Sequence, residues 1–135
     1  MFARALGVLL FVLCFSAEAQ QPRKLFRLGY LTAGDPVSRR DRVEALRQGL
    51  RELGYVEGKN IIVEYRYAQG RSDRLPELAR ELIRLNVEII FAGGAPATDA
   101  AKNATSMLPI VSTSDDPVGR GFVTGLPRPG GNITG

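Results

Sequence analysis

The sequence predicts an α/β fold, a parallel sheet flanked by helices on both faces, and three observations predict it. Short apolar runs alternate with amphipathic helical patterns, the connections between them are short, and Gly or Pro stands at most boundaries. This alternation is typical of βαβ units, whose right-handed crossovers place helices on both sides of a parallel sheet. After the N-terminal signal described below, about 115 residues remain, enough chain for one domain.

The first half of the predicted domain is a strand, a helix and a second strand. The first strand covers 25–31, and the turn 32–36 follows it. A helix is predicted from Ser38, because apolar residues recur there at helical spacing and form one stripe. The stripe consists of Val43, Leu46, Leu50 and Leu53. Gly54 comes directly after it, where a left-handed C-cap favours glycine, and the second strand covers 60–67.

The second predicted helix has both a start signal and a stop signal. Asp73 is expected to be its N-cap, with Pro76 in the first turn, where a missing N–H costs nothing. Leucines at helical spacing form its apolar stripe, and Asn86 can end it. The leucines are Leu75, Leu78, Leu82 and Leu85.

Three further elements are predicted before the chain becomes rich in Pro and Gly. They are a strand over 87–92, a helix through 97–104 and a short strand over 109–112. Beyond Asp116, glycine and proline recur every few residues. We expect the tail from Pro127 to Gly135 to be disordered.

The N-terminal residues have the order of an export signal. Arg4 supplies a positive charge, residues 5–16 form an apolar run, and the small-x-small triplet 17–19 precedes polar residues. The run is about a dozen residues, too short to cross a hydrocarbon core of roughly 30 Å as a helix. We therefore expect a signal peptide over 1–19, cleavage before Gln20 and a periplasmic mature protein. An uncleaved membrane anchor is the alternative.

The composition excludes several kinds of chemistry. The chain has no histidine, and its single cysteine, Cys14, lies inside the apolar run of the signal. The mature protein then offers no thiol or imidazole for catalysis or metal binding. Its positive charge comes from arginines interleaved with acids, which favours a solvated surface over nucleic-acid binding. Neither G-x-G-x-x-G nor a Gly-Lys-Ser/Thr phosphate loop is present, so we expect no enzyme and no cofactor.

The loops at the carboxyl ends of the predicted strands are the candidate binding site, because open parallel sheets bind ligands beyond that edge. These loops are 32–34, 68–70, 92–95 and 113–116. The turn 93–96 matters most, because its glycines let the backbone approach a ligand and the next helix offers free N–H groups to an anion. A plain βα turn has the same sequence features. The candidate residues are Thr32, Ala33, Gly34, Gly93, Gly94, Ala95, Pro96, Ser114, Asp115 and Asp116.

Two groups of residues in or near this edge have competing interpretations. Asp116 precedes Pro117, so it suits a helix N-cap as well as a ligand contact. Three tyrosines at strand positions can line an aromatic pocket or pack in the core. They are Tyr30, Tyr65 and Tyr67.

The longest distinctive motif covers 47–60 and reads RQGLRELGYVEGKN. Shorter motifs lie at 28–31, 64–68, 74–79, 116–118 and 128–135. Together they resemble the ABC-transporter substrate-binding family that includes tryptophan-binding TrpX-like proteins, and the resemblance covers nearly the whole mature chain. Each short motif is weak by itself, whereas 47–60 is specific.

The resemblance implies a type I periplasmic binding protein, in which two α/β lobes trap a small polar solute, such as an amino acid, between them. Its partners would be that solute and an ABC permease of the inner membrane. Members of the family are longer than this chain, so we expect 20–135 to be the N-terminal ligand-binding lobe, truncated before the second lobe. A sensor or interaction module on the same scaffold is the alternative function.

The resemblance also places the site. By position, the family's cleft loops correspond to 32–34, 93–96 and 114–116 of this chain. In one departure, the family commonly has a glycine before Asp-Pro, where this chain has Asp115. The two adjacent carboxylates leave open whether a ligand amine or another cation is bound there.

Overall fold

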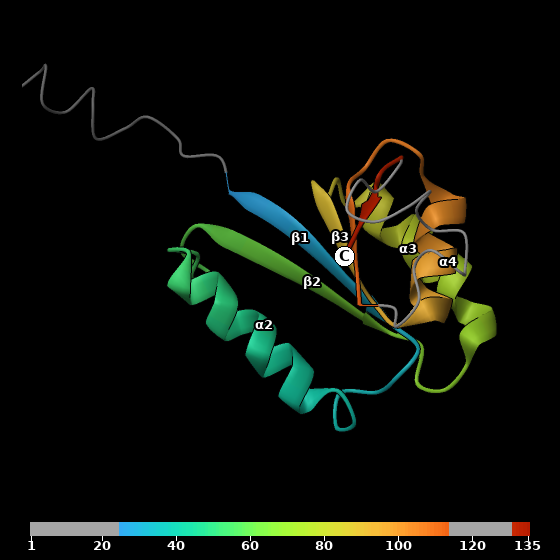
Figure 1. Ribbon diagram of the computed structural model, residues 1–135, viewed down its shortest axis with the longest axis horizontal. Helices are drawn as coiled ribbons and strands as arrows, with labels where there is room; N and C mark the ends of the chain where they lie inside the picture. Colours follow the sequence, from blue (N-terminus) through green and yellow to red (C-terminus); the bar gives the residue numbers. More distant parts are fainter. Residues whose placement is uncertain (1–24, 114–130) are drawn as a thin grey trace, which may run out of the picture.

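The sheet is parallel throughout and its strand order is β2-β1-β3-β4-β5 in the computed structural model, which describes residues 25–113 and 131–135 (Figure 1). All four pairings between neighbouring strands are parallel. The elements are β1 (Phe26–Thr32), α2 (Arg40–Glu52), β2 (Ile61–Tyr67), the 3₁₀ turn η1 (Ser72–Arg74), α3 (Leu75–Arg84), β3 (Ile89–Gly93), α4 (Ala95–Ala104), β4 (Ile110–Ser112) and β5 (Ile133–Thr134). The predicted fold class is confirmed.

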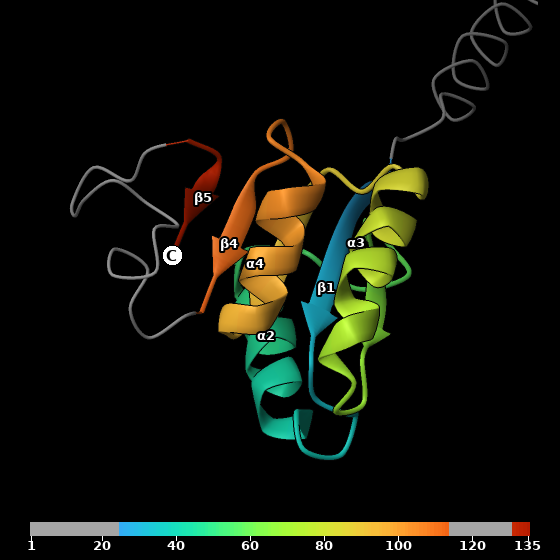
Figure 2. The same ribbon diagram turned by 90° about the vertical axis from the view of Figure 1, so that its right-hand side faces the viewer.

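Helices cover both faces of the sheet, but unequally. Figures 1 and 2 show α2 on one face and α3 with α4 on the other. The largest apolar cluster lies on the α3–α4 side, where Leu31 of β1 and Ile90 of β3 pack with the inner faces of the two helices. On the other side, α2 buries only Val43. The α3–α4 layer therefore contributes most of the hydrophobic stabilisation.

Several predicted helix ends agree with the structure, but the helix predicted from Ser38 begins at Arg40, the helix predicted over 97–104 begins at Ala95, and two further details differ. Pro76 lies in the first turn of α3, and Gly54 and Asn86 have positive φ just after their helices. Asp73 is not an N-cap: it lies in η1, and Arg74 precedes α3 without a side-chain cap. The 3₁₀ turn continues directly into α3, so its own carbonyls satisfy early N–H groups. Leu53 is 76% exposed, because α2 ends there and the chain turns away.

The expected disorder of the tail is wrong for residues 131–135. Ile133 and Thr134 form β5, which pairs with β4, and Ile133 is buried in the main apolar cluster. Asn132 prepares this pairing, because its Nδ2 donates to the carbonyl oxygens of Leu108 at 2.8 Å and Thr105 at 3.2 Å. The rest of that tail, 127–130, lies outside the described residues.

Membrane crossing requires a helix of sufficient length and apolar character. Across 25–113 and 131–135, no helix meets that requirement. The expected signal peptide over 1–19 lies outside the described residues, so export stays a prediction.

Candidate functional site

The carboxyl ends of β1, β3 and β4 lie side by side, because these strands are neighbours in the sheet. Thr32, the last residue of β1, pairs with Gly93, the last residue of β3. The buried Thr32 hydroxyl donates to the Gly93 carbonyl at 3.3 Å and accepts the Gly34 N–H at 3.2 Å. Thr32 thus ties the loop 32–34 to the turn 93–96, and the structure brings these two predicted segments to one edge.

The turn 93–96 leads into α4 and is held by several hydrogen bonds. Gly94 precedes the helix with φ 98°, a backbone conformation that favours glycine. Its carbonyl accepts the Thr98 hydroxyl at 2.8 Å and the Thr98 N–H at 3.1 Å. Its own N–H donates to the Thr113 hydroxyl at 3.1 Å. The N–H groups of Ala95 and Ala97 make no hydrogen bond within the described part of the chain. Ala97 is fully buried, so the partly buried Ala95 supplies the donor that α4 offers to an anion.

A buried hydroxyl pair supports the turn from behind. Thr98 and Ser112 lie 2.8 Å apart at their hydroxyl oxygens and are both buried. This bond joins the first turn of α4 to the end of β4 and fixes where the helix begins relative to the sheet. The sequence analysis missed Thr98, because a threonine inside a helix carries no distinctive signal until its partner across the fold is known.

Arg39 is a second residue that the sequence analysis missed. It is the N-cap of α2, and its half-buried side chain lies over the loop after β1. A Cβ added to Gly34 would come within 2.6 Å of Nε of Arg39, and one added to Gly94 would lie 3.9 Å from a terminal guanidinium nitrogen. The guanidinium therefore reaches from α2 across both predicted loops.

An apolar hollow of about 340 Å³ opens at the same edge, between α2 and the sheet. Tyr30 of β1 and Phe91 of β3 stack in its wall, with ring centroids 5.8 Å apart. The other lining residues are Arg42, Ala45, Leu46, Gly93 and Thr113. Tyr30 also contacts the rings of Tyr65 and Tyr67, so it both packs in an aromatic layer and lines a pocket.

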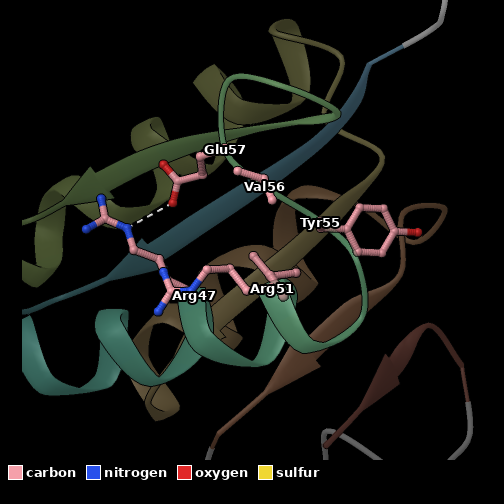
Figure 3. Close-up of a pocket in the computed structure, with 6 residues that line it drawn as sticks. Arg47, Arg51, Tyr55, Val56 and Glu57 are labelled. Carbon is pink, nitrogen blue, oxygen red and sulfur yellow. Dashed lines mark hydrogen bonds and ion pairs between the residues drawn. The ribbon is translucent and has the colours of Figure 1, made fainter.

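A smaller hollow of about 250 Å³ lies at the other end of α2, next to the turn that leads into β2 (Figure 3). Here Nε of Arg47 donates to Glu57 at 2.9 Å and to the Tyr65 hydroxyl at 3.1 Å, and that hydroxyl donates to Glu57 at 2.6 Å. Burial, followed by the bond to Glu57, raises the pKa of the Tyr65 phenol. The charges here neutralise one another, so this network fastens α2 to β2 rather than receiving a ligand.

The structure places seven of the ten predicted site residues, all at one edge: Thr32, Ala33, Gly34, Gly93, Gly94, Ala95 and Pro96. The other three, Ser114, Asp115 and Asp116, lie outside the described residues. In the ranges 25–113 and 131–135, no three His, Cys, Asp or Glu side chains gather where they can hold a metal ion.

Residues 35–135 match the family model described as ABC transporter substrate binding protein. The chain belongs to this family. One family relative is a tyrosine-binding protein from Clostridioides difficile, 35% identical over 89 residues, which are 65% of this chain and 26% of the relative. The chain thus spans about a quarter of that protein.

Solved structures share the fold of this substrate-binding family member. In each of the three that follow, the match spans 38% of the solved chain. A conserved domain protein from Vibrio cholerae is 32% identical over 83% of this chain, with a TM-score of 0.78. The ligand-free, open structure of a Clostridium difficile substrate-binding protein with adhesive properties is 27% identical over 82%, with a TM-score of 0.76. An ABC domain from Streptococcus pneumoniae in complex with L-Trp is 24% identical over 83%, with a TM-score of 0.77, a likeness of fold.

Proposed function

We propose that the protein is the solute-binding component of an ABC importer, and that it binds an amino acid at the edge formed by 32–34, 93–96 and 114–116. The observation that carries the proposal is the α4 N-terminus, whose Ala95 N–H makes no hydrogen bond in the described residues and stands beside the Thr32 loop. The names of two relatives, a tyrosine-binding protein and a domain in complex with L-Trp, support an aromatic amino acid as the ligand.

The chemistry of the edge suits such a ligand. The Ala95 N–H faces the acidic group, and the exposed Thr113 hydroxyl is a further polar contact. The hollow lined by Tyr30 and Phe91 opens beside these groups and offers an apolar surface to the side chain. Polar contacts fix the orientation, and the apolar wall contributes affinity.

The proposal extends to the whole protein. The signal 1–19 exports it to the periplasm, residues 20–135 form one wall of the cleft, and a second lobe closes over the ligand. A permease in the inner membrane then receives the solute. The protein catalyses no reaction, and it requires neither a cofactor nor a metal ion.

Exchange of Gly94 for a branched residue tests the proposed site. Valine disfavours a positive φ, so Gly94→Val displaces the turn that presents the α4 N-terminus. We expect the affinity for L-tyrosine or L-tryptophan to fall at least about tenfold, the loss of one charge-assisted hydrogen bond. Titration calorimetry of the mature protein purified from its host measures this loss.

Gly58→Val is the matched control, because Gly58 also has a positive φ of 84° and lies in open space at the opposite end of the sheet. Both variants carry a similar backbone strain, of about 1–3 kcal/mol, which thermal unfolding measures separately. A folded Gly94→Val protein that binds as tightly as the Gly58→Val protein would show that the ligand is held elsewhere.

A further inference from the structure

Arg39 differs from every other arginine in the described part of the chain. Five arginines there have a carboxylate within 4 Å: Arg27, Arg47, Arg51, Arg66 and Arg71. Among the arginines without such a partner in these residues, Arg39 alone is half-buried, while the others are exposed. A partly buried arginine without a counter-charge in these residues favours an anion beside it.

Asp35, the acid in the turn that leads to Arg39, is engaged elsewhere. Oδ1 of Asp35 accepts the N–H groups of Ser38 at 2.8 Å and Val37 at 2.9 Å. These bonds, that to Ser38 first, lower the pKa of the Asp35 carboxyl and hold the turn that leads into α2. Asp35 therefore orients the segment that carries Arg39 and makes no ion pair with its guanidinium.

The positive charge of Arg39 acts on Tyr30 of β1. Burial raises the pKa of the Tyr30 phenol, and the positive charges of Arg39 and, more weakly, Arg42 act against this rise. Tyr30 lines the apolar hollow, and its hydroxyl would lie 3.2 Å from a Cβ added to Gly93. The Arg39 charge is therefore directed toward the edge where the candidate loops meet.

We infer that Arg39 binds the acidic group of the ligand together with the α4 N-terminus, and that it selects ligands with a free carboxylate over their neutral amides. The inference rests on the proposed function and names the side chain that sets the charge preference of its site. Two positive features converge on one point: the guanidinium spans Gly34 and Gly94, and α4 begins directly after Gly94.

The absence of a side chain at Gly34 leaves room for the side chain of Arg39. Gly34 does not have a positive φ, so its backbone conformation is open to other residues. A methyl group at this position would still meet Nε of Arg39 at 2.6 Å and its Cγ at 2.9 Å. The glycine leaves room for Arg39 to cross the loop, and Gly34→Ala is expected to displace the side chain without removing its charge.

Arg39→Gln tests the inference, with Arg40→Gln as the matched control. Arg40 is exposed, follows Arg39 directly and has no contact with either glycine loop that the structure records. The probes are L-tyrosine, L-tryptophan and their amides, titrated calorimetrically into the mature protein from its host. For the free acids, Arg39→Gln should weaken binding at least about tenfold, Arg39→Lys less, and Arg40→Gln not at all.

The amides separate ligand binding from a loss of structure. We expect the wild type and Arg39→Gln to bind each amide equally weakly, because the guanidinium then has no carboxylate to pair with. Gly34→Ala should weaken binding of the acids in the same way. If the wild type binds an acid and Arg39→Gln matches Arg40→Gln, this inference is wrong and the proposed function stands. If the wild type binds neither acid, both are wrong.

Discussion

Two glycines of the lobe have opposite surroundings. Gly29 of β1 faces α3 so closely that an added Cβ would lie 3.0 Å from Cδ1 of the buried Leu82. At Gly49 of α2, no atom lies within 4 Å of that position apart from the surrounding backbone of the helix itself and the neighbouring residues. The first glycine is needed for the approach of a helix to the sheet, and the second only lowers the stability of its own helix.

Alanine at each position should therefore act in opposite directions. Gly29→Ala overpacks the core and should lower the free energy of unfolding by about 1–3 kcal/mol. Gly49→Ala should raise it by roughly 0.5–1 kcal/mol, because alanine loses less backbone entropy in a helix. Urea unfolding of both variants beside the wild type measures the change. A stable Gly29→Ala protein would mean that α3 does not lie this close to β1.

Single residues also show how far sequence reasoning reaches. The segments 32–34 and 93–96 were found because glycine and proline after an apolar strand have a known local meaning. Arg39 and Thr98 were not found, since each acquires its role from a partner distant in the chain. Arg39 looked like part of a solvated helix face, and its partial burial and its position beside Gly34 and Gly94 distinguish it from Arg40.

At the scale of elements, α2 and α3 are attached to the sheet by different forces. The apolar face of α3 buries Leu75, Leu78, Ala79 and Leu82. In α2 the one buried residue is Val43, and its other described attachments include the polar network of Arg47, Glu57 and Tyr65. Exposed ion pairs contribute little, so α2 is held by less free energy than α3.

Amide hydrogen exchange should reveal this difference. We expect the amides of α2 to exchange faster than those of α3, because local opening of α2 exposes little apolar surface. Exchange monitored by mass spectrometry resolves the two helices as separate peptides, and α4, which buries Ala97, Thr98, Ala100 and Ala101, is the internal reference. Equal protection of α2 and α3 would contradict the argument.

The strands and helices differ in how well local sequence patterns predict them. Alternating apolar runs were sufficient to find β1 to β4 and the three helices, because their periodicity differs between strand and helix. β5 has only two residues, Ile133 and Thr134, too few for any pattern. It exists because Asn132 bonds to the segment before β4 and Ile133 fills a space in the shared core, and both facts belong to the tertiary structure.

At the scale of the whole molecule, the α2 face of the sheet is an aromatic layer of Tyr30, Tyr65, Tyr67 and Phe91. Burial is the largest cause that raises the pKa of each of the three phenols above the ordinary value of 10.0. The folded state thus holds these protons more tightly than the unfolded state. The resulting stability is complete below pH 10 and is lost as the pH rises toward the folded-state pKa values.

We therefore expect the protein to lose stability in alkali, with Tyr65 a main contributor. Urea unfolding at about pH 9 and about pH 11 should show a fall in the wild type and a smaller fall in Tyr65→Phe, which has no phenol to ionise there. The ionisation itself can be followed by the ultraviolet absorbance of phenolate. An identical fall in both proteins would mean that Tyr65 has the same pKa folded and unfolded.

The unequal attachment of α2 has a mechanical consequence. The helix is fastened to β2 through Arg47, whereas its first turns stand over a hollow of about 340 Å³. It is attached to the sheet at two points, by the buried Val43 in its first turn and by Arg47 further along the helix. Arg39 directly precedes the first of these points, so the reach of its guanidinium is set by where α2 lies over the sheet, whereas the turn 93–96 is set by the sheet itself.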